Sequence, residues 1–241
     1  MITLSLLPVA VLLYYIYKCD YKPEPFSMIA RGLFFGVCSV SVVMIWVSVL
    51  RMLGITDYFE GGEPTFVSQF LKAFVLAAIP EEFSKLLMLH LLLRKNKYFD
   101  EHIDGIVYAA CVGLGFAGYE NLMYVCGSED WIFVGVTRAI SAVPCHFMTA
   151  IAMGYYYSLY RFNIDGKKSQ WAQKMILVPI LFHGVYDAIL MTASVVGSIL
   201  IVAMIVGIVL WMNKMRKFSK EKIAELKRMD EFDQKNEDQL A

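Results

Sequence analysis

Seven long apolar runs, separated by short charged connections, follow one another along this chain. Each run approaches the ~20 residues that a helix rising ~1.5 Å per residue needs to cross a ~30 Å hydrocarbon layer. The pattern predicts an all-α polytopic membrane protein with seven transmembrane helices. We place these helices at about residues 2–17, 29–50, 66–93, 103–125, 131–160, 171–192 and 195–212.

The charged residues in the connections alternate in sign. Basic connections include Lys18, Arg94 and Lys167, whereas acid-rich connections include Asp57 and Glu129. Cytoplasmic loops carry the excess of lysine and arginine in membrane proteins. The alternation therefore predicts an outer N-terminus, a cytoplasmic C-terminus and an odd number of spans.

Composition agrees with a membrane protein, because 58% of the 241 residues are hydrophobic. The formal net charge is zero, and the charges are concentrated in the connections, which argues against a nucleic-acid partner. The first run has no basic leader or cleavage site, so we expect it to remain as a span. We expect residues 1–212 to form one multi-pass domain and residues 213–241 to form a charged helical tail in the cytoplasm.

Two adjacent carboxylates and a lysine interrupt the third apolar run, as Glu81, Glu82 and Lys85. An ionised side chain near the middle of a bilayer costs ~2.5–3.5 kcal/mol on insertion scales, so the group indicates either function or mutual neutralisation. On a helix Lys85 lies one turn from both glutamates and can pair with either. One negative charge then remains unmatched.

Three further spans carry polar residues that a lipid-facing helix would avoid. They are Phe116, Glu120 and Asn121 in the fourth span, Arg138 and His146 in the fifth, and His183 and Asp187 in the sixth. Each one alone has a structural explanation, such as a helix-to-helix hydrogen bond or a buried ion pair. Together they predict one interior pocket, because ionisable groups from several spans avoid lipid by facing one another.

The predicted pocket has the groups needed for hydrolysis. Two adjacent carboxylates in a poorly solvated site do not both ionise cheaply, so we expect one to hold a proton while the other stays anionic beside Lys85. The anionic carboxylate is a candidate general base for water, and the histidines are candidate donors to an oxyanion or a leaving amine. The five cysteines suggest neither disulfides nor a zinc site, but two histidines with a glutamate leave a divalent metal such as zinc open.

Four short motifs resemble those of the PrsW family of membrane proteases, in the family's order on successive spans. EEFSK at 81–85 resembles its EExxK motif, and FAGYEN at 116–121 resembles its FxxxE motif. His146 resembles its isolated histidine, and HGVYD at 183–187 resembles its HxxxD motif. Other branches of the superfamily, such as the CAAX prenyl endopeptidases, typically have histidine at the position of Glu120, which disfavours prenylated substrates. The match covers about residues 66–190.

The resemblance implies a glutamate-type intramembrane endopeptidase of the bacterial plasma membrane. The family's usual substrate is a single-pass anti-sigma factor, cut on its extracytoplasmic side to begin the release of a sigma factor in a stress response. From the residues and the resemblance we assign as catalytic Glu81, Glu82, Glu120, His146 and His183. We assign as supporting Lys85, Phe116, Asn121, Arg138 and Asp187. We expect no cofactor, although the family is often described as metalloproteases.

Two alternative functions fit the same intramembrane charges. A proton- or cation-coupled transporter also places Asp, Glu and His inside the membrane, but we find no inverted repeat or matching pair of broken helices. A noncatalytic membrane partner protein would keep the residues for binding alone. Cleavage of a single-pass substrate by purified protein would distinguish the protease from both.

Overall fold

The structure is a computed structural model that describes residues 1–196 and 198–240, so Gly197 and Ala241 lie outside the described residues. All regular elements of the described residues are helices, which confirms the predicted all-α class. The main helices are α1 (Ile2–Tyr17), α2 (Phe26–Met52), α4 (Phe66–Lys72), α5 (Ile79–Leu93), α6 (Asp104–Cys126), α7 (Trp131–Ile140), α8 (Ala142–Arg161), α9 (Lys168–Thr192) and α10 (Ser198–Leu240). The short helices are α3 (Ile55–Glu60), η1 (Ala73–Ala78), η2 (Ile164–Gly166) and η3 (Ala193–Val195).

Within the described residues, four segments are long and apolar enough to cross a membrane. They are Phe26–Met52, Asp104–Cys126, Trp131–Arg161 and Lys168–Val195. These four segments make the chain a multi-pass membrane protein. The remaining predicted spans correspond to α1, to the interrupted run through α4, η1 and α5, and to the first half of α10. The count of seven and the orientation stay predictions.

The third predicted span is a helix whose middle is widened. Between α4 and α5, η1 is a π-helix, in which the N–H of Ile79 bonds the carbonyl of Phe74 five residues back. Pro80 follows directly and explains the widening, because its ring lacks an N–H and clashes with the carbonyl four residues earlier. Single π turns inside helices occur often at functional sites. Here the turn lies immediately before Glu81.

The fifth predicted span divides into two helices, α7 and α8. Ser141 leaves the helical region at φ −125° and ψ −69°. Pro144 accounts for the break, because proline cannot bond the carbonyl four residues back, which belongs to Ile140, the last residue of α7. The break lies before His146, and Pro144 itself sits in the first turn of α8.

Helix α6 is the centre of the bundle and packs mainly against α2 and α8. Glycines allow its backbone to approach both neighbours. A Cβ at Gly115 would clash with the carbonyl of Leu33 in α2, and a Cβ at Gly154 of α8 would clash with Gly105 of α6. The consequence is a tightly packed scaffold in which most of α6 and α8 is buried.

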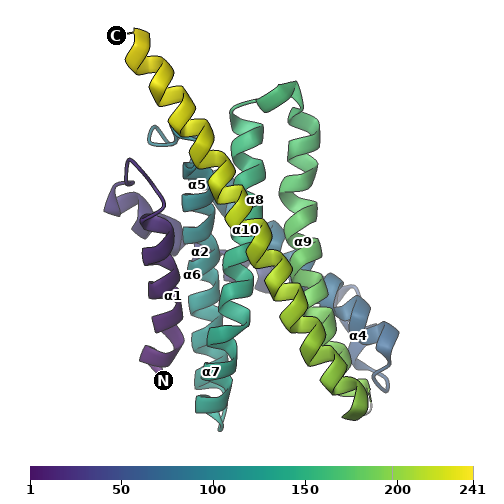
Figure 1. Ribbon diagram of the computed structural model, residues 1–241. Helices are drawn as coiled ribbons and strands as arrows, with labels where there is room; N and C mark the ends of the chain where they lie inside the picture. Colours follow the sequence, from purple (N-terminus) through teal and green to yellow (C-terminus); the bar gives the residue numbers. More distant parts are fainter. Residues whose placement is uncertain (197, 241) are drawn as a thin grey trace.

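Helix α10 continues for 43 residues without a break at residue 213. Figure 1 shows it crossing in front of α8 and α9, with the two chain termini at opposite ends of the bundle. Its second half carries the charged tail, yet Met215, Ile223 and Leu226 are buried. Glu225 also accepts a hydrogen bond of 2.6 Å from the Tyr155 hydroxyl of α8. The tail therefore packs along the bundle instead of standing free in solvent.

Candidate active site

The first turn of α5 places Glu81, Glu82 and Lys85 in the interior of the bundle. The Lys85 ammonium lies 2.9 Å from Glu82 Oε1 and 3.4 Å from Glu81 Oε2. Glu82 is 0% exposed and Lys85 is 1% exposed, whereas the Glu81 side chain is 12% exposed. The two carboxylates thus differ in access, although both face one ammonium.

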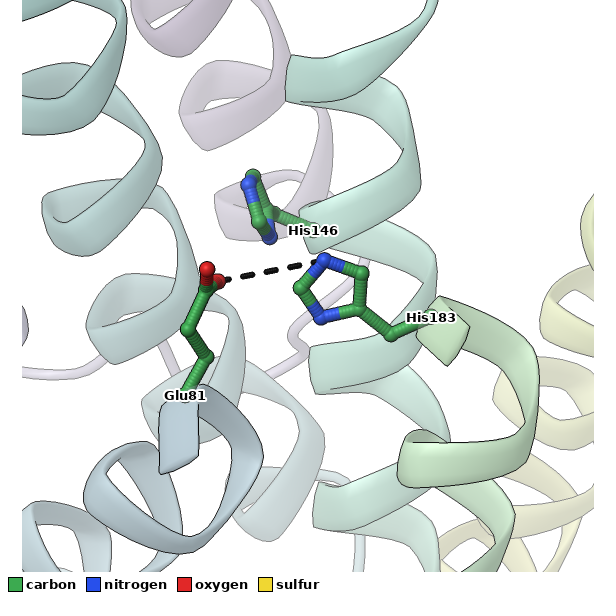
Figure 2. A group of neighbouring side chains, drawn as sticks. All are labelled: Glu81, His146 and His183. Atoms are coloured by element: carbon green, nitrogen blue, oxygen red, sulfur yellow. Dashed lines mark ion pairs between the residues drawn. The ribbon is translucent and has the colours of Figure 1, made fainter. Parts of the chain in front are cut away.

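His183 of α9 joins this pair from the other side. Its Nδ1 lies 2.9 Å from Glu82 Oε1, and its Nε2 lies 3.2 Å from Asp187 Oδ2 one turn further along the helix. The same Nε2 faces Glu81 Oε2 at 3.8 Å, the pair joined by the dashed line in Figure 2. A close contact of Gly184 with the Phe74 ring holds α9 against η1. His183 is therefore fixed within reach of three carboxylates.

His146 of α8 links the α5 residues to α6. Its Nδ1 lies 3.1 Å from Lys85 Nζ, and its Nε2 lies 2.8 Å from Glu120 Oε2. Arg138 donates to the same Glu120 oxygen at 2.7 Å. On one straight helix, residues eight apart would be separated by ~12 Å along the axis. The break at Ser141 is what brings Arg138 and His146 to one oxygen.

Aromatic and amide groups complete the site. The Phe116 ring lies under the Lys85 ammonium at 4.0 Å and meets the His146 ring edge-on at 5.2 Å. Such an ammonium-to-ring contact stabilises a desolvated cation. Asn121 accepts from Arg138 Nε at 3.1 Å and donates to the Ser5 carbonyl at 2.9 Å. Asn121 therefore ties the site to α1 without touching the carboxylates of α5.

The structure brings all ten assigned residues into one connected network. Figure 2 shows three of them, Glu81, His146 and His183, pointing toward one another from three different helices. Thr149 belongs to the network although the sequence motifs do not include it, since its hydroxyl donates to Glu82 Oε1 at 3.3 Å. The available signal was its position three residues after His146, which places it on the same face of α8.

The charge balance of this network is unusual for a membrane interior. Four carboxylates, those of Glu81, Glu82, Glu120 and Asp187, meet two permanent cations, Lys85 and Arg138. Two histidines can each take up a proton. A buried network with more carboxylates than permanent cations is suited to moving protons. Combined with a multi-pass helical bundle, it is typical of membrane proteins that move protons or use water as a reactant, a class that includes both enzymes and transporters.

Comparison with known proteins identifies the class more closely. Residues 24–212 match the family described as PrsW family intramembrane metalloprotease. Protease PrsW of Bacillus subtilis (strain 168) is 37% identical over 187 residues, which cover 77% of this chain and 80% of that protein. Protease PrsW of Clostridioides difficile (strain 630) is 35% identical over 222 residues, covering 90% of this chain and 89% of that protein. No solved structure matches the chain significantly.

The chain therefore belongs to the PrsW family and is a membrane protease. This identification confirms the resemblance seen in the four motifs. It also favours the protease over the transporter and over a noncatalytic partner.

The family description raises the question of a metal ion. Glu81, His146 and His183 offer ligand atoms that all lie within 4.8 Å of one another. Two histidines and a glutamate form a known catalytic zinc set, so the residue types and their separation fit a divalent ion. These three residues would hold the ion, which would polarise a carbonyl and make bound water more acidic. In the described structure, both His146 nitrogens and both His183 nitrogens are instead paired with protein groups.

Proposed function

We propose that the protein is an endopeptidase that hydrolyses a peptide bond of a single-pass membrane protein with water activated by Glu81. The observation that carries this proposal is the meeting of Glu81, Glu82, Lys85 and two histidines inside the bundle, linked by contacts of 2.9–3.8 Å. Hydrolysis of a peptide bond in a membrane segment needs a general base that activates water, a hydrogen-bond donor to the oxyanion and a proton for the leaving amine.

Glu81 is the better base of the two glutamates. Glu82 Oε1 already receives Lys85, His183 and Thr149, and the side chain is fully buried. Glu81 has longer contacts, 3.4 Å to Lys85 and 3.8 Å to His183, and keeps some exposure. A water molecule can therefore approach Glu81 while Glu82 fixes the positions of Lys85 and His183.

The remaining groups serve the two halves of the reaction. Water loses a proton to Glu81 as its oxygen attacks the carbonyl carbon of the substrate. His183 Nε2, beside Glu81, would donate a hydrogen bond to the oxyanion by exchanging its contact with Asp187 for the new oxygen. Glu81 then returns the proton to the leaving amine as the carbon–nitrogen bond breaks. Glu120 orients His146, and Asp187 orients His183.

Metal dependence distinguishes the glutamate mechanism from a metalloprotease mechanism in which a bound ion activates the water. The Lys85 ammonium lies 3.1 Å from His146 Nδ1, so it would repel a cation ligated by that nitrogen. We expect purified protease in detergent to keep its cleavage rate after treatment with strong chelators, with no stoichiometric metal by elemental analysis. Loss of activity that zinc restores would instead support Glu81, His146 and His183 as ligands.

The substrate class follows from the family resemblance. We propose a single-pass anti-sigma factor, cut near the outer surface of the membrane, with the second cleavage made by another protease. Co-expression with each single-pass anti-sigma factor of the same cell, followed by immunoblotting, should show one candidate shortened. A Glu81→Gln variant at equal membrane level should leave that candidate intact. If every candidate stays intact with the active protein, the substrate belongs to another class.

The membrane orientation gives a further prediction. Basic connections alternate with acid-rich ones, and the described N- and C-termini lie at opposite ends of the bundle (Figure 1). We propose seven spans with the C-terminus in the cytoplasm of a bacterial plasma membrane. A reporter that works in the cytoplasm alone should be active when fused after the last residue, and a reporter that works outside alone should be inactive there. The opposite pair of results would invert the orientation and the proposed side of cleavage.

A further inference from the structure

A second group of carboxylates lies where the α1–α2 connection meets the α5–α6 connection. Lys22 Nζ contacts Glu101 Oε1 at 3.1 Å and so joins the two connections directly. Asp20 and Asp104 are 8% and 1% exposed. We propose that Asp20, Glu101 and Asp104 bind a hard divalent cation, Mg²⁺ or Ca²⁺, at a site separate from the catalytic network.

The separation of the ligand atoms fits one ion. One carboxylate oxygen from each of Asp20, Glu101 and Asp104 lies within 4.8 Å of the other two. Metal-to-oxygen distances are ~2.0–2.1 Å for Mg²⁺ and ~2.3–2.6 Å for Ca²⁺, so two oxygens on one ion lie at most ~5 Å apart. The three side chains therefore need little movement to share an ion.

Buried oxygens without partners provide a second, independent observation. Among the described residues, Asp20 Oδ2 and Glu101 Oε2 are buried and receive no hydrogen bond. The other oxygens of these carboxylates are used, since Asp20 Oδ1 accepts from the Lys22 N–H at 3.0 Å and Glu101 Oε1 pairs with Lys22 Nζ. An unpaired buried carboxylate oxygen is costly and needs an explanation. A cation bound by these two oxygens supplies one.

Neighbouring charges also favour a cation. Glu24, 5% exposed, adds a fourth carboxylate beside this group. Lys22 is 57% exposed in its side chain, so its charge is largely screened by solvent. When ionised, these carboxylates carry more negative charge than the one Lys22 ammonium offsets.

The type of metal-ligand atom distinguishes this site from the catalytic one. Asp20, Glu101 and Asp104 supply oxygen alone, and oxygen ligands suit Mg²⁺ and Ca²⁺. The catalytic group includes imidazole nitrogens, which suit zinc. A bound ion would clamp the α1–α2 connection to the start of α6, the helix that carries Phe116 and Glu120. Binding to the folded state alone would stabilise the fold.

The test is the thermal stability of metal-stripped protein in detergent, with Mg²⁺, Ca²⁺ or Zn²⁺ added alone. We expect the melting temperature to rise by about 5 °C at ~100-fold excess over the dissociation constant of the preferred ion. Equilibrium dialysis should find one ion per chain. A rise with Mg²⁺ alone or with Ca²⁺ alone identifies the resident ion, and a rise with both supports a site that accepts either.

Matched variants decide whether these residues form the site. In Asp20→Asn, added metal should no longer raise the melting temperature, and dialysis should find no bound ion. Glu101→Gln should behave in the same way and provides the test if Asp20→Asn folds poorly. Two control variants should keep the metal-dependent rise in melting temperature and the bound ion. They are Glu81→Gln, in the catalytic network, and Asp57→Asn, exposed in α3. Without metal, Asp20→Asn should melt no lower than the stripped parent, because the substitution removes a repelled carboxylate. The proposal would be overturned if neither Mg²⁺ nor Ca²⁺ raised the melting temperature of the parent protein. It would also be overturned if the melting temperatures of Asp20→Asn and Glu101→Gln rose as much as that of the parent.

Discussion

Glu81→Gln is expected to reduce the rate of substrate cleavage by ~10²–10⁴-fold, the usual effect of losing a positioned general base. Glutamine keeps the size and hydrogen-bonding reach of glutamate but cannot take a proton from water. The side chain is partly exposed, so the change should leave folding nearly intact. Cleavage would be followed by the appearance of substrate fragments on gels, at matched levels of the protein in the membrane.

Glu82→Gln is the natural comparison for this experiment, because Glu82 lies next to Glu81 and is proposed to position Lys85 and His183 instead of activating water. It should reduce the rate less than Glu81→Gln, and it should also lower the melting temperature, since Glu82 Oε1 holds Lys85 and His183. Glu129→Gln, in the exposed α6–α7 connection, should change neither quantity. A larger loss of rate in Glu82→Gln than in Glu81→Gln would exchange the two assignments.

Lys85→Met is expected to destabilise the protein by about 3–5 kcal/mol, because it leaves Glu82 buried without its ammonium partner. Methionine keeps the length of the side chain, so lost packing contributes little. Cleavage should fall below detection as well, since Lys85 also contacts Glu81 and His146. Thermal unfolding in detergent and the cleavage assay would measure the two effects.

The double variant Lys85→Met with Glu82→Gln separates loss of charge pairing from loss of packing. Removing both members of the buried pair should restore much of the stability lost in Lys85→Met, because no unpaired charge remains. Activity should not return. A double variant as unstable as the sum of the two single changes would show that the pair contributes little to the fold.

Much of the site was predictable because membrane burial makes each charge informative. Glu81, Glu120, His146 and His183 occur in different apolar runs, and avoidance of lipid is enough to predict that they meet. The all-α class followed from the same runs. The structure places these side chains in direct contact, with His146 between Lys85 and Glu120.

Other features depended on backbone geometry that hydropathy does not record. The π turn before Pro80 and the break at Ser141 decide which atoms face each other, yet the hydropathy of each run gives no sign of either. The charges of residues 213–241 predicted a charged helical tail, with no sign that it would pack against the spans. It packs on the bundle through sparse apolar positions such as Ile223 and Leu226. The partly buried acidic group near Asp20 was missed because its members are far apart in sequence.

The measurement that tests the glutamate mechanism most directly is cleavage of a purified single-pass substrate by the Glu81→Gln, Glu82→Gln double variant. The variant and the parent protease would be reconstituted at equal amounts in the same lipid vesicles, with circular dichroism confirming equal helix content. The mechanism predicts no fragments from the double variant over times in which the parent protease cuts the substrate completely. Cleavage by the double variant at the parent rate would show that neither carboxylate activates water.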